Sequence, residues 1–148
     1  MMLAVQSHYH ELCKRIIQLD PKIRFTGIIN DNGRLVTGAA KEEITFFVEE
    51  KDREMLFMET ALRTRMLGDF DSCLGTVDFS IYHRKNVVMM EFPIDNVTVY
   101  VSSEKDIDLN EVSFMISTLL RRDDTASFGT QDSQLSIPLN SKEIKQEC

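Results

Sequence analysis

Residues 87–92 read Val87-Val88-Met89-Met90-Glu91-Phe92, and this stretch decides the fold. Successive side chains of a β-strand point to opposite faces of the sheet, so a strand with one wet face alternates apolar and polar residues. From Val87 to Met90 both faces of such a strand would be apolar. The stretch therefore predicts a strand that other elements cover on both sides.

Two further strands flank this stretch and form a meander with it. Residues 76–83 alternate apolar and polar side chains, which is typical of a strand with one buried face. A turn at residues 84–86 connects this strand to the next one. A second turn at residues 93–96 leads into the apolar run at residues 97–101, so three consecutive strands pair antiparallel.

A separate hairpin is predicted near the N-terminus. Residues 23–29 and residues 35–36 are apolar runs on either side of Asn30-Asp31-Asn32-Gly33. Asn-Gly tolerates the positive backbone φ angles that a tight hairpin turn needs, so we predict positive φ at Asn32 and Gly33. The sheet then has five antiparallel strands.

Three segments carry apolar residues at spacings of three and four, the period of one helical face. They are residues 3–19, 49–67 and 109–122. Asp20-Pro21 ends the first helix because proline disfavours helical geometry in the residue before it. Asp108 and Glu111 resemble a capping box at the start of the third.

The second helix carries an apolar stripe of methionine and leucine. We interpret this stripe, together with Met89 and Met90 of the predicted strand, as core, although methionine also suits surfaces that repack against partners. Before this helix, we expect a short turn of helix within residues 44–48. The stripe consists of Met55, Met58, Leu62 and Met66.

These elements give the order α-β-β-α-β-β-β-α, an α+β fold with a five-stranded antiparallel sheet. We expect the first and third helices on one face of the sheet and the second helix on the other. Residues 1–122 then form a single domain. Residues 123–148 are mostly polar and cannot bury enough apolar surface to offset ordering, so we predict a disordered tail.

Charge and composition narrow the classes of partner. The chain has 148 residues with 17 Lys and Arg against 24 Asp and Glu, a formal charge of −7. This acidity argues against nucleic acid as a partner. The sequence holds no run of about 18 apolar residues, so we expect no membrane insertion and no secretion signal. The cysteines Cys13, Cys73 and Cys148 lie far apart without a CxxC pair, and we expect a cytoplasmic protein without disulfides.

Known catalytic patterns are missing from the sequence. Gly33 and Gly38 have the spacing of a phosphate-binding loop, but Ala39-Ala40 stand where Lys and Ser or Thr would bind phosphate. His8 and His10 are two positions apart on a helix and point about 200° apart, so we do not interpret them as metal ligands. We predict no enzyme, no metal and no cofactor. An enzyme built around Cys73, His83, Asp69 and Asp71 stays open as an alternative.

Several separated blocks resemble an uncharacterised archaeal family of short proteins. The resemblance spans about residues 5–122, leaves the tail outside, and carries no assigned activity, so it transfers no catalytic residue. The blocks are residues 20–27 (DPKIRFTG), 33–36 (GRLV), 70–75 (FDSCLG), 87–93 (VVMMEFP) and 100–108 (YVSSEKDID).

In element order the chain is also similar to the roadblock-type dynein light chain superfamily, which shares its architecture with profilin and longin domains. Members of that superfamily typically dimerise and act as scaffolds or regulators of small GTPases, without catalysis of their own. The resemblance implies a dimer surface on the second helix and the third strand, whose unpaired edge must be blocked or used. The candidate residues are Met58, Leu62, Arg65, Val77, Asp78, Phe79 and Ser80.

Our leading hypothesis is a non-enzymatic, roadblock-like interaction module, a homodimer that docks a signalling protein or small GTPase. The alternative is a small-molecule sensor like the PAS domains, in which the methionine-rich second helix covers a ligand pocket. Ligand binding would stabilise the sensor against unfolding, which separates the two hypotheses.

Overall fold

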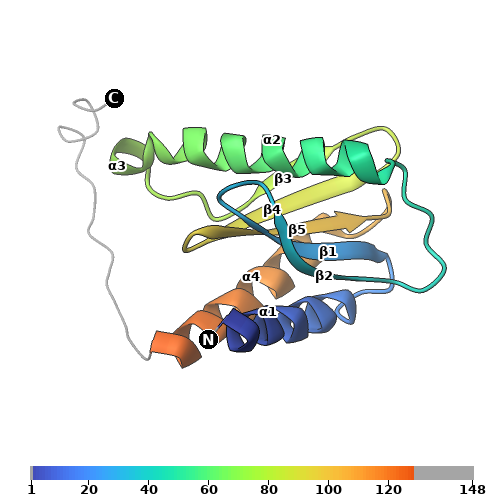
Figure 1. Ribbon diagram of the computed structural model, residues 1–148, viewed down its shortest axis with the longest axis horizontal. Coiled ribbons are helices and arrows are strands. Elements are labelled where there is room, and N and C mark those ends of the chain that lie inside the picture. The colour runs from blue at the N-terminus through green and yellow to red at the C-terminus, as the bar shows by residue number, and fades with distance from the viewer. Residues whose placement is uncertain (1, 129–148) are drawn as a thin grey trace.

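A central antiparallel sheet organises the chain, as the computed structural model shows for residues 2–128 (Figure 1). The elements are α1 (Met2–Ile17), β1 (Ile23–Asn30), β2 (Leu35–Ala40), α2 (Glu50–Gly68), α3 (Asp71–Leu74), β3 (Ser80–His83), β4 (Val88–Ile94), β5 (Val97–Ser103) and α4 (Leu109–Phe128). The five strands lie in the order β2-β1-β5-β4-β3, and every neighbouring pair is antiparallel.

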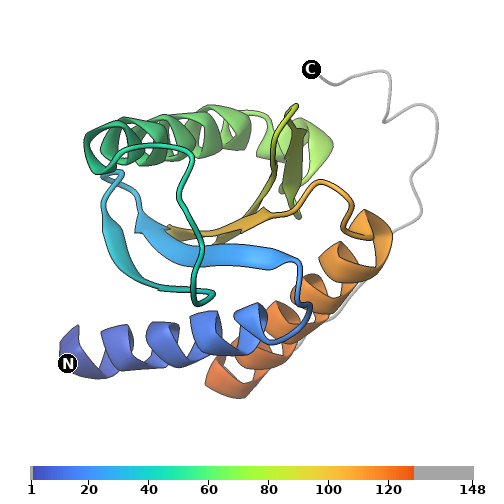
Figure 2. The ribbon, with the colours of Figure 1, turned by 90° about the vertical axis from the view of Figure 1, so that its right-hand side faces the viewer.

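The predicted α+β fold with helices on both faces of the sheet is confirmed. Helices α1 and α4 lie against one face, and α2 lies against the other (Figure 2). Side chains around β4 alternate between the two layers. Val88 and Met90 pack with α1 and α4, whereas Val87 and Met89 pack with α2. The strand is therefore covered on both sides, as its apolar pattern predicts.

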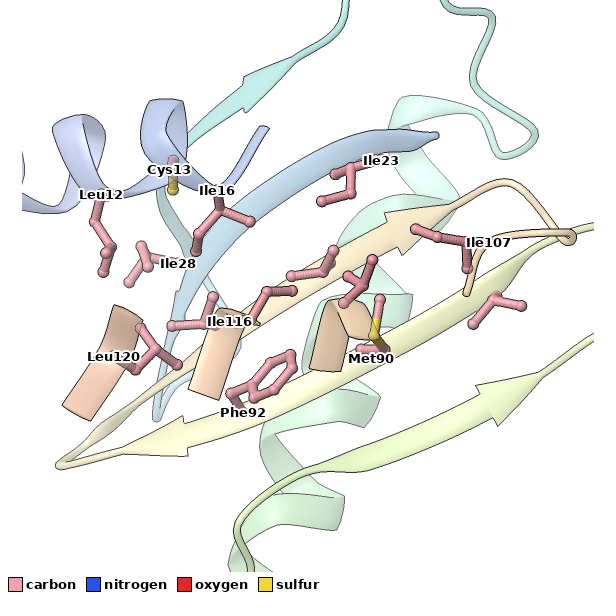
Figure 3. Close-up of a cluster of buried hydrophobic side chains, with 14 of the residues drawn as sticks. Leu12, Cys13, Ile16, Ile23, Ile28, Met90, Phe92, Ile107, Ile116 and Leu120 are labelled. Atoms are coloured by element: carbon pink, nitrogen blue, oxygen red, sulfur yellow. The ribbon is translucent and has the colours of Figure 1, made fainter. Parts of the chain in front are cut away.

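The larger hydrophobic cluster lies between the sheet and helices α1 and α4 (Figure 3). Leu12, Cys13 and Ile16 of α1 are at most 1% exposed. Burying one such aliphatic side chain contributes about 1.5–3 kcal/mol. The inner faces of α1 and α4 are therefore committed to the core. Their partners in the cluster include Ile28, Phe92, Val112, Ile116 and Leu120.

β1 and β2 form the predicted hairpin, but its turn differs from the predicted one. Gly33 has φ 80°, whereas Asn32 does not have a positive φ. Instead, the side-chain Oδ1 of Asn30 accepts hydrogen bonds from the backbone N–H groups of Asn32 and Arg34, both at 3.0 Å. A Cβ on Gly33 would lie 2.7 Å from the Cα of Met58 in α2. Glycine is therefore needed here for the turn and for the close contact with α2.

The third strand is shorter than the predicted one. β3 begins at Ser80, and residues 76–79 make no ladder with β4. Continuing the register that pairs Ser80 with Glu91 would set Asp78 opposite Pro93, which has no N–H to donate. The preceding helix α3, which ends at Gly75 with φ 85°, is not predicted by the sequence pattern.

The turn of helix expected within residues 44–48 is wrong. Two arginines hold this segment in an irregular conformation. The Arg24 Nη2 donates to the Thr45 carbonyl at 2.6 Å, and the Arg53 Nη1 donates to the Val48 carbonyl at 3.0 Å. These side chains satisfy carbonyls that a helical turn would otherwise pair with backbone N–H groups.

Helix α4 continues beyond its predicted end at Arg122 and runs to Phe128. Residues 123–128 of the predicted disordered tail are thus helical. Extending an existing helix adds one backbone hydrogen bond for each residue that is fixed, so a helix that has formed can continue into a polar stretch. The rest of the predicted tail, residues 129–148, lies outside the described residues.

Candidate interaction surface

The methionine stripe of α2 lies on the surface, so its interpretation as core is wrong, whereas the same interpretation is confirmed for Met89 and Met90 of β4, which are 5% and 0% exposed. Met55 is 71% exposed, Leu62 49% and Met66 65%. The side of α2 that packs on the sheet carries instead the smaller set Phe57, Thr60 and Ala61. We call Met55, Leu62 and Met66 the crest of α2. A row of large exposed apolar side chains makes the crest a candidate interaction surface.

A polar network fastens α2 to the sheet. Glu91 on β4 is buried, and its carboxylate accepts hydrogen bonds from Thr60 Oγ1 at 2.9 Å and from Arg63 Nη2 at 2.7 Å. Arg63 also donates from Nε to the Tyr82 hydroxyl of β3 and from Nη1 to Glu59, both at 2.9 Å. The side of α2 that carries Arg63 therefore faces β3.

Burial and pairing oppose each other at Arg63. Burial alone would lower the pKa of its guanidinium, whereas the hydrogen bond to Glu59, the charge of Glu91 and the contact with Tyr82 raise it. The pKa is raised above its ordinary value as the net result. Arg63 therefore stays charged and joins α2 to β3 and β4 through Tyr82 and Glu91.

The structure does not bring the predicted dimer residues together on one surface. Met58 and Arg65 lie on the side of α2 that faces the β1–β2 hairpin. Met58 backs onto Gly33, and the Arg65 Nη2 donates to the Asp31 carbonyl at 3.0 Å. Leu62 lies on the crest. The predicted residues 77–80 lie in and just before β3, which faces the other side of α2, the side that carries Arg63.

The edge of the sheet at β3 is open. β3 comes last in the strand order and pairs with β4 alone. Ser80 lies opposite Glu91 and so faces α2, whereas the Phe79 ring contacts the Phe92 ring on the α4 side, with centroids 5.6 Å apart. One edge of backbone donors and acceptors is therefore available for another strand.

Several exposed apolar side chains near this edge are not among the residues that the sequence predicts for the interaction surface. Leu67, Phe70 and Leu74 are exposed at the end of α2 and in α3, and Phe114 of α4 is 66% exposed. Leu67, Val77, Phe79 and Phe114 line one groove of about 970 Å³. Helical spacing could have flagged Phe114, which falls off the buried stripe of α4. Nothing in the sequence marks the short helix α3.

Cys13 is a free thiol with no exposed surface, so it is not an accessible nucleophile. Of the residues in the enzyme alternative, Asp71 and Cys73 lie in α3 and His83 ends β3. Within residues 2–128 no group of three or more His, Cys, Asp or Glu side chains could hold a metal ion. None of the helices in that range is long and apolar enough to cross a membrane.

Solved structures with the same arrangement define the class of fold. A Roadblock/LC7 domain from Streptomyces avermitilis superposes with a TM-score of 0.61 at 7% identity, covering 80% of this chain and 96% of that one. MglB from Myxococcus xanthus gives 0.61 at 14% identity, with the same coverage. The gliding protein MglB from Thermus thermophilus gives 0.61 at 10% identity, covering 76% and 84%. The protein thus has a roadblock fold.

Sequence comparison places the chain more narrowly. Residues 2–131 match a family of unknown function, DUF6659, and the chain belongs to that family. The match extends past residue 122, where the resemblance noted from the sequence blocks ends. No curated protein matches the chain by sequence.

Proposed function

We propose that this protein is a non-enzymatic roadblock module that forms a homodimer through β3 and docks a small GTPase or another signalling protein. The observation that carries the proposal is the open β3 edge beside the exposed apolar side chains of α2 and α3. A second copy related by a twofold axis pairs β3 with β3 and continues the sheet across both copies. The pairing satisfies the free backbone groups of the edge.

The twofold axis sets which side of α2 lies in the interface. Both α2 helices lie on the same face of the joined sheet, with the sides that face β3 turned toward each other. That side carries Arg63 and Leu67, whereas Met58 and Arg65 lie on the far side. The proposal therefore assigns Leu67 to the dimer interface and leaves Met58 and Arg65 outside it.

The crest of α2 stays exposed in such a dimer and is the proposed docking surface for the partner. Apolar side chains at the centre of an interface supply most of its affinity, and methionine is enriched in such positions. A GTPase as the partner follows from the resemblance to the roadblock superfamily. It also implies the cytoplasmic location that the sequence predicts. The sequence blocks also imply an archaeal origin. A search of genomes for chains with all five blocks tests this, and we expect to find them in archaea.

Sedimentation at micromolar concentrations tests the dimer. The wild-type chain has a mass of 17.1 kDa, and we expect a species of twice that mass. Leu67→Glu should give a monomer, because it brings a carboxylate into an apolar contact next to its symmetry mate. Met58→Glu is the matched control, since Met58 is similarly exposed but lies on the far side of α2, and it should stay dimeric. A wild-type chain that is monomeric at every concentration rules out the dimer.

The partner is tested separately. Small GTPases encoded in the same genome, loaded with GTP or GDP, are measured against the wild type and Met66→Glu by biolayer interferometry. We expect one GTPase to bind the wild type, and Met66→Glu to lose that binding while it still sediments as a dimer. Binding that is unchanged in Met66→Glu excludes the crest as the docking surface.

A further inference from the structure

A cavity of about 350 Å³ lies on the α2 side of the sheet, and the turn between β3 and β4 forms part of its lining. Phe57 of α2, Met89 of β4 and Tyr100 of β5 form its apolar floor, and Phe46 and Phe47 form its outer wall. Small-molecule sites are typically apolar hollows of about 300–1,000 Å³ with a few polar groups. The size and lining of this cavity are those of a ligand site.

The wall of the cavity is built by stacking rather than by secondary structure. The Arg24 guanidinium lies 4.5 Å from the Phe47 ring centroid, and the Arg53 guanidinium lies 4.4 Å from that of Phe46. Arg24 is further held by Glu104 at 3.1 Å, and Arg53 by the hydrogen bond to the Val48 carbonyl. These two arginines are therefore engaged in holding the loop over the cavity.

The charge of the lining is opposite to that of the protein. Arg24, Arg53, Arg84 and Lys85 line the cavity, and none of its lining residues is acidic, although the chain carries a net charge of −7. Within residues 2–128, the side chains of Arg84 and Lys85 have no hydrogen bond or ion pair. Two cations next to an apolar hollow favour an anion, because low-dielectric walls focus their field.

Tyr100 places an unused hydrogen-bonding group on the floor. It is 5% exposed, and its ring packs edge-on against Phe57 with centroids 5.4 Å apart. Its hydroxyl has no hydrogen-bond partner among the described residues, although a buried tyrosine hydroxyl usually finds one. Among the described residues, Thr118 Oγ1 is the one solvent-inaccessible side-chain oxygen that lacks a hydrogen-bond partner. The Tyr100 hydroxyl also lacks a partner, so it is not solvent-inaccessible. Because Tyr100 lines the cavity, we infer that its hydroxyl opens into it. Burial and the charge of Glu91 raise the pKa of Tyr100, whereas the charges of Arg84 and Arg63 lower it; the pKa is raised as the net result, so the hydroxyl stays a donor.

We propose that this cavity binds a small amphipathic anion. Its flat apolar body lies against Phe57 and Met89, its carboxylate or phosphate pairs with Arg84 and Lys85, and one oxygen accepts a hydrogen bond from the Tyr100 hydroxyl. The lining contains no residue of β3 and none of the crest of α2, and its test measures ligand binding rather than self-association, so a failure of this inference is distinguishable from a failure of the dimer.

Three ligands that share one aromatic body test the proposal by titration calorimetry with the full chain. They are 1-naphthaleneacetate, 1-naphthyl phosphate and the neutral 2-(1-naphthyl)ethanol. We expect saturable binding of at least one anion, and at least tenfold weaker binding of the alcohol, because hydrogen bonds to charged groups are the stronger ones. The order of the two anions shows whether the site prefers carboxylate or phosphate.

Variants locate the site. The double variant Arg84→Gln with Lys85→Gln should weaken the bound anion at least tenfold and leave the alcohol unchanged, and Tyr100→Phe should weaken the anion several-fold. Arg65→Gln, an exposed arginine of α2 outside the cavity, is the control and should bind like the wild type. Equal affinity for the alcohol, unchanged affinity in the double variant, or no saturable binding of any of the three ligands at millimolar concentration would overturn the proposal.

Discussion

Arg63 of α2 and Glu91 of β4 form an ion pair of 2.7 Å, and the Glu91 side chain is only 3% exposed. Removing one partner of a buried pair leaves the other charge without compensation. Arg63→Met should therefore lower the free energy of unfolding by about 3 kcal/mol, the lower end of the usual range, because Thr60 still donates to Glu91. Urea unfolding measures the effect.

The matched control for this prediction lies two residues further along α2. Among residues 2–128, Arg65 bonds only to the exposed Asp31 carbonyl, so Arg65→Met should change the free energy of unfolding by less than about 1 kcal/mol. Equal effects of the two substitutions would contradict the role assigned to Glu91.

Gly33 and Gly75 separate backbone strain from close contact. Both have positive φ, 80° and 85°, but a Cβ at Gly33 would meet the Cα of Met58 at 2.7 Å, whereas a Cβ at Gly75 would meet nothing within 4 Å. Gly75 has φ 85° and ψ 163°, a conformation that essentially only glycine adopts, so Gly75→Ala should cost about 1–3 kcal/mol through backbone strain alone. Gly33→Ala should cost clearly more, about 3–5 kcal/mol, since hairpin and helix must also move apart. Thermal unfolding of the two variants measures both losses of stability. Equal losses would show that the contact between the hairpin and α2 adds nothing to the cost at Gly33.

Cys13 gives the protein a pH dependence in the alkaline range. The thiol is fully buried, and burial raises its pKa from 9.0 to about 12. The folded state therefore keeps the proton in a range where the unfolded state loses it. The stability contributed by the neutral buried thiol is complete below pH 9 and falls as the pH rises from 9 toward 12, by up to about 1.4 kcal/mol per pH unit.

Comparison with Cys13→Ala isolates this effect from the titration of other groups. Urea unfolding of both proteins between pH 8 and pH 10.5 should show a gap in stability that narrows as the pH rises. A gap of constant size would mean that the thiol is not buried in its neutral form.

The sequence predicts the sheet well because its strongest signal is local. The residues from Val87 to Met90 are apolar at both even and odd positions, so both faces of a strand would be apolar there. A strand buried on both faces explains this pattern more simply than a helix or a strand with one exposed face does. The prediction fails at residues 76–79, where the alternating pattern is that of a strand. The missing N–H of Pro93, distant in sequence, ends the ladder there.

The functional surfaces are less predictable for two physical reasons. An apolar helical stripe looks the same whether it packs on its own sheet or on another protein, so Met55 and Met66 are indistinguishable from core residues by spacing alone. The cavity is assembled from Arg24, Arg53 and Arg84, which belong to three distant segments. Arg84 and Lys85 in particular resemble an ordinary polar turn until β4 and β5 bring them beside Tyr100.

Hydrogen exchange at the backbone amides of β3 tests the central claim most directly. If a second copy pairs with the open edge, the outward-facing amides of residues 80–83 exchange slowly in the concentrated protein, faster on dilution, and fast at every concentration in Leu67→Glu. Outward-facing amides that exchange fast in the concentrated wild-type protein would contradict the account, because the edge would then be open in solution.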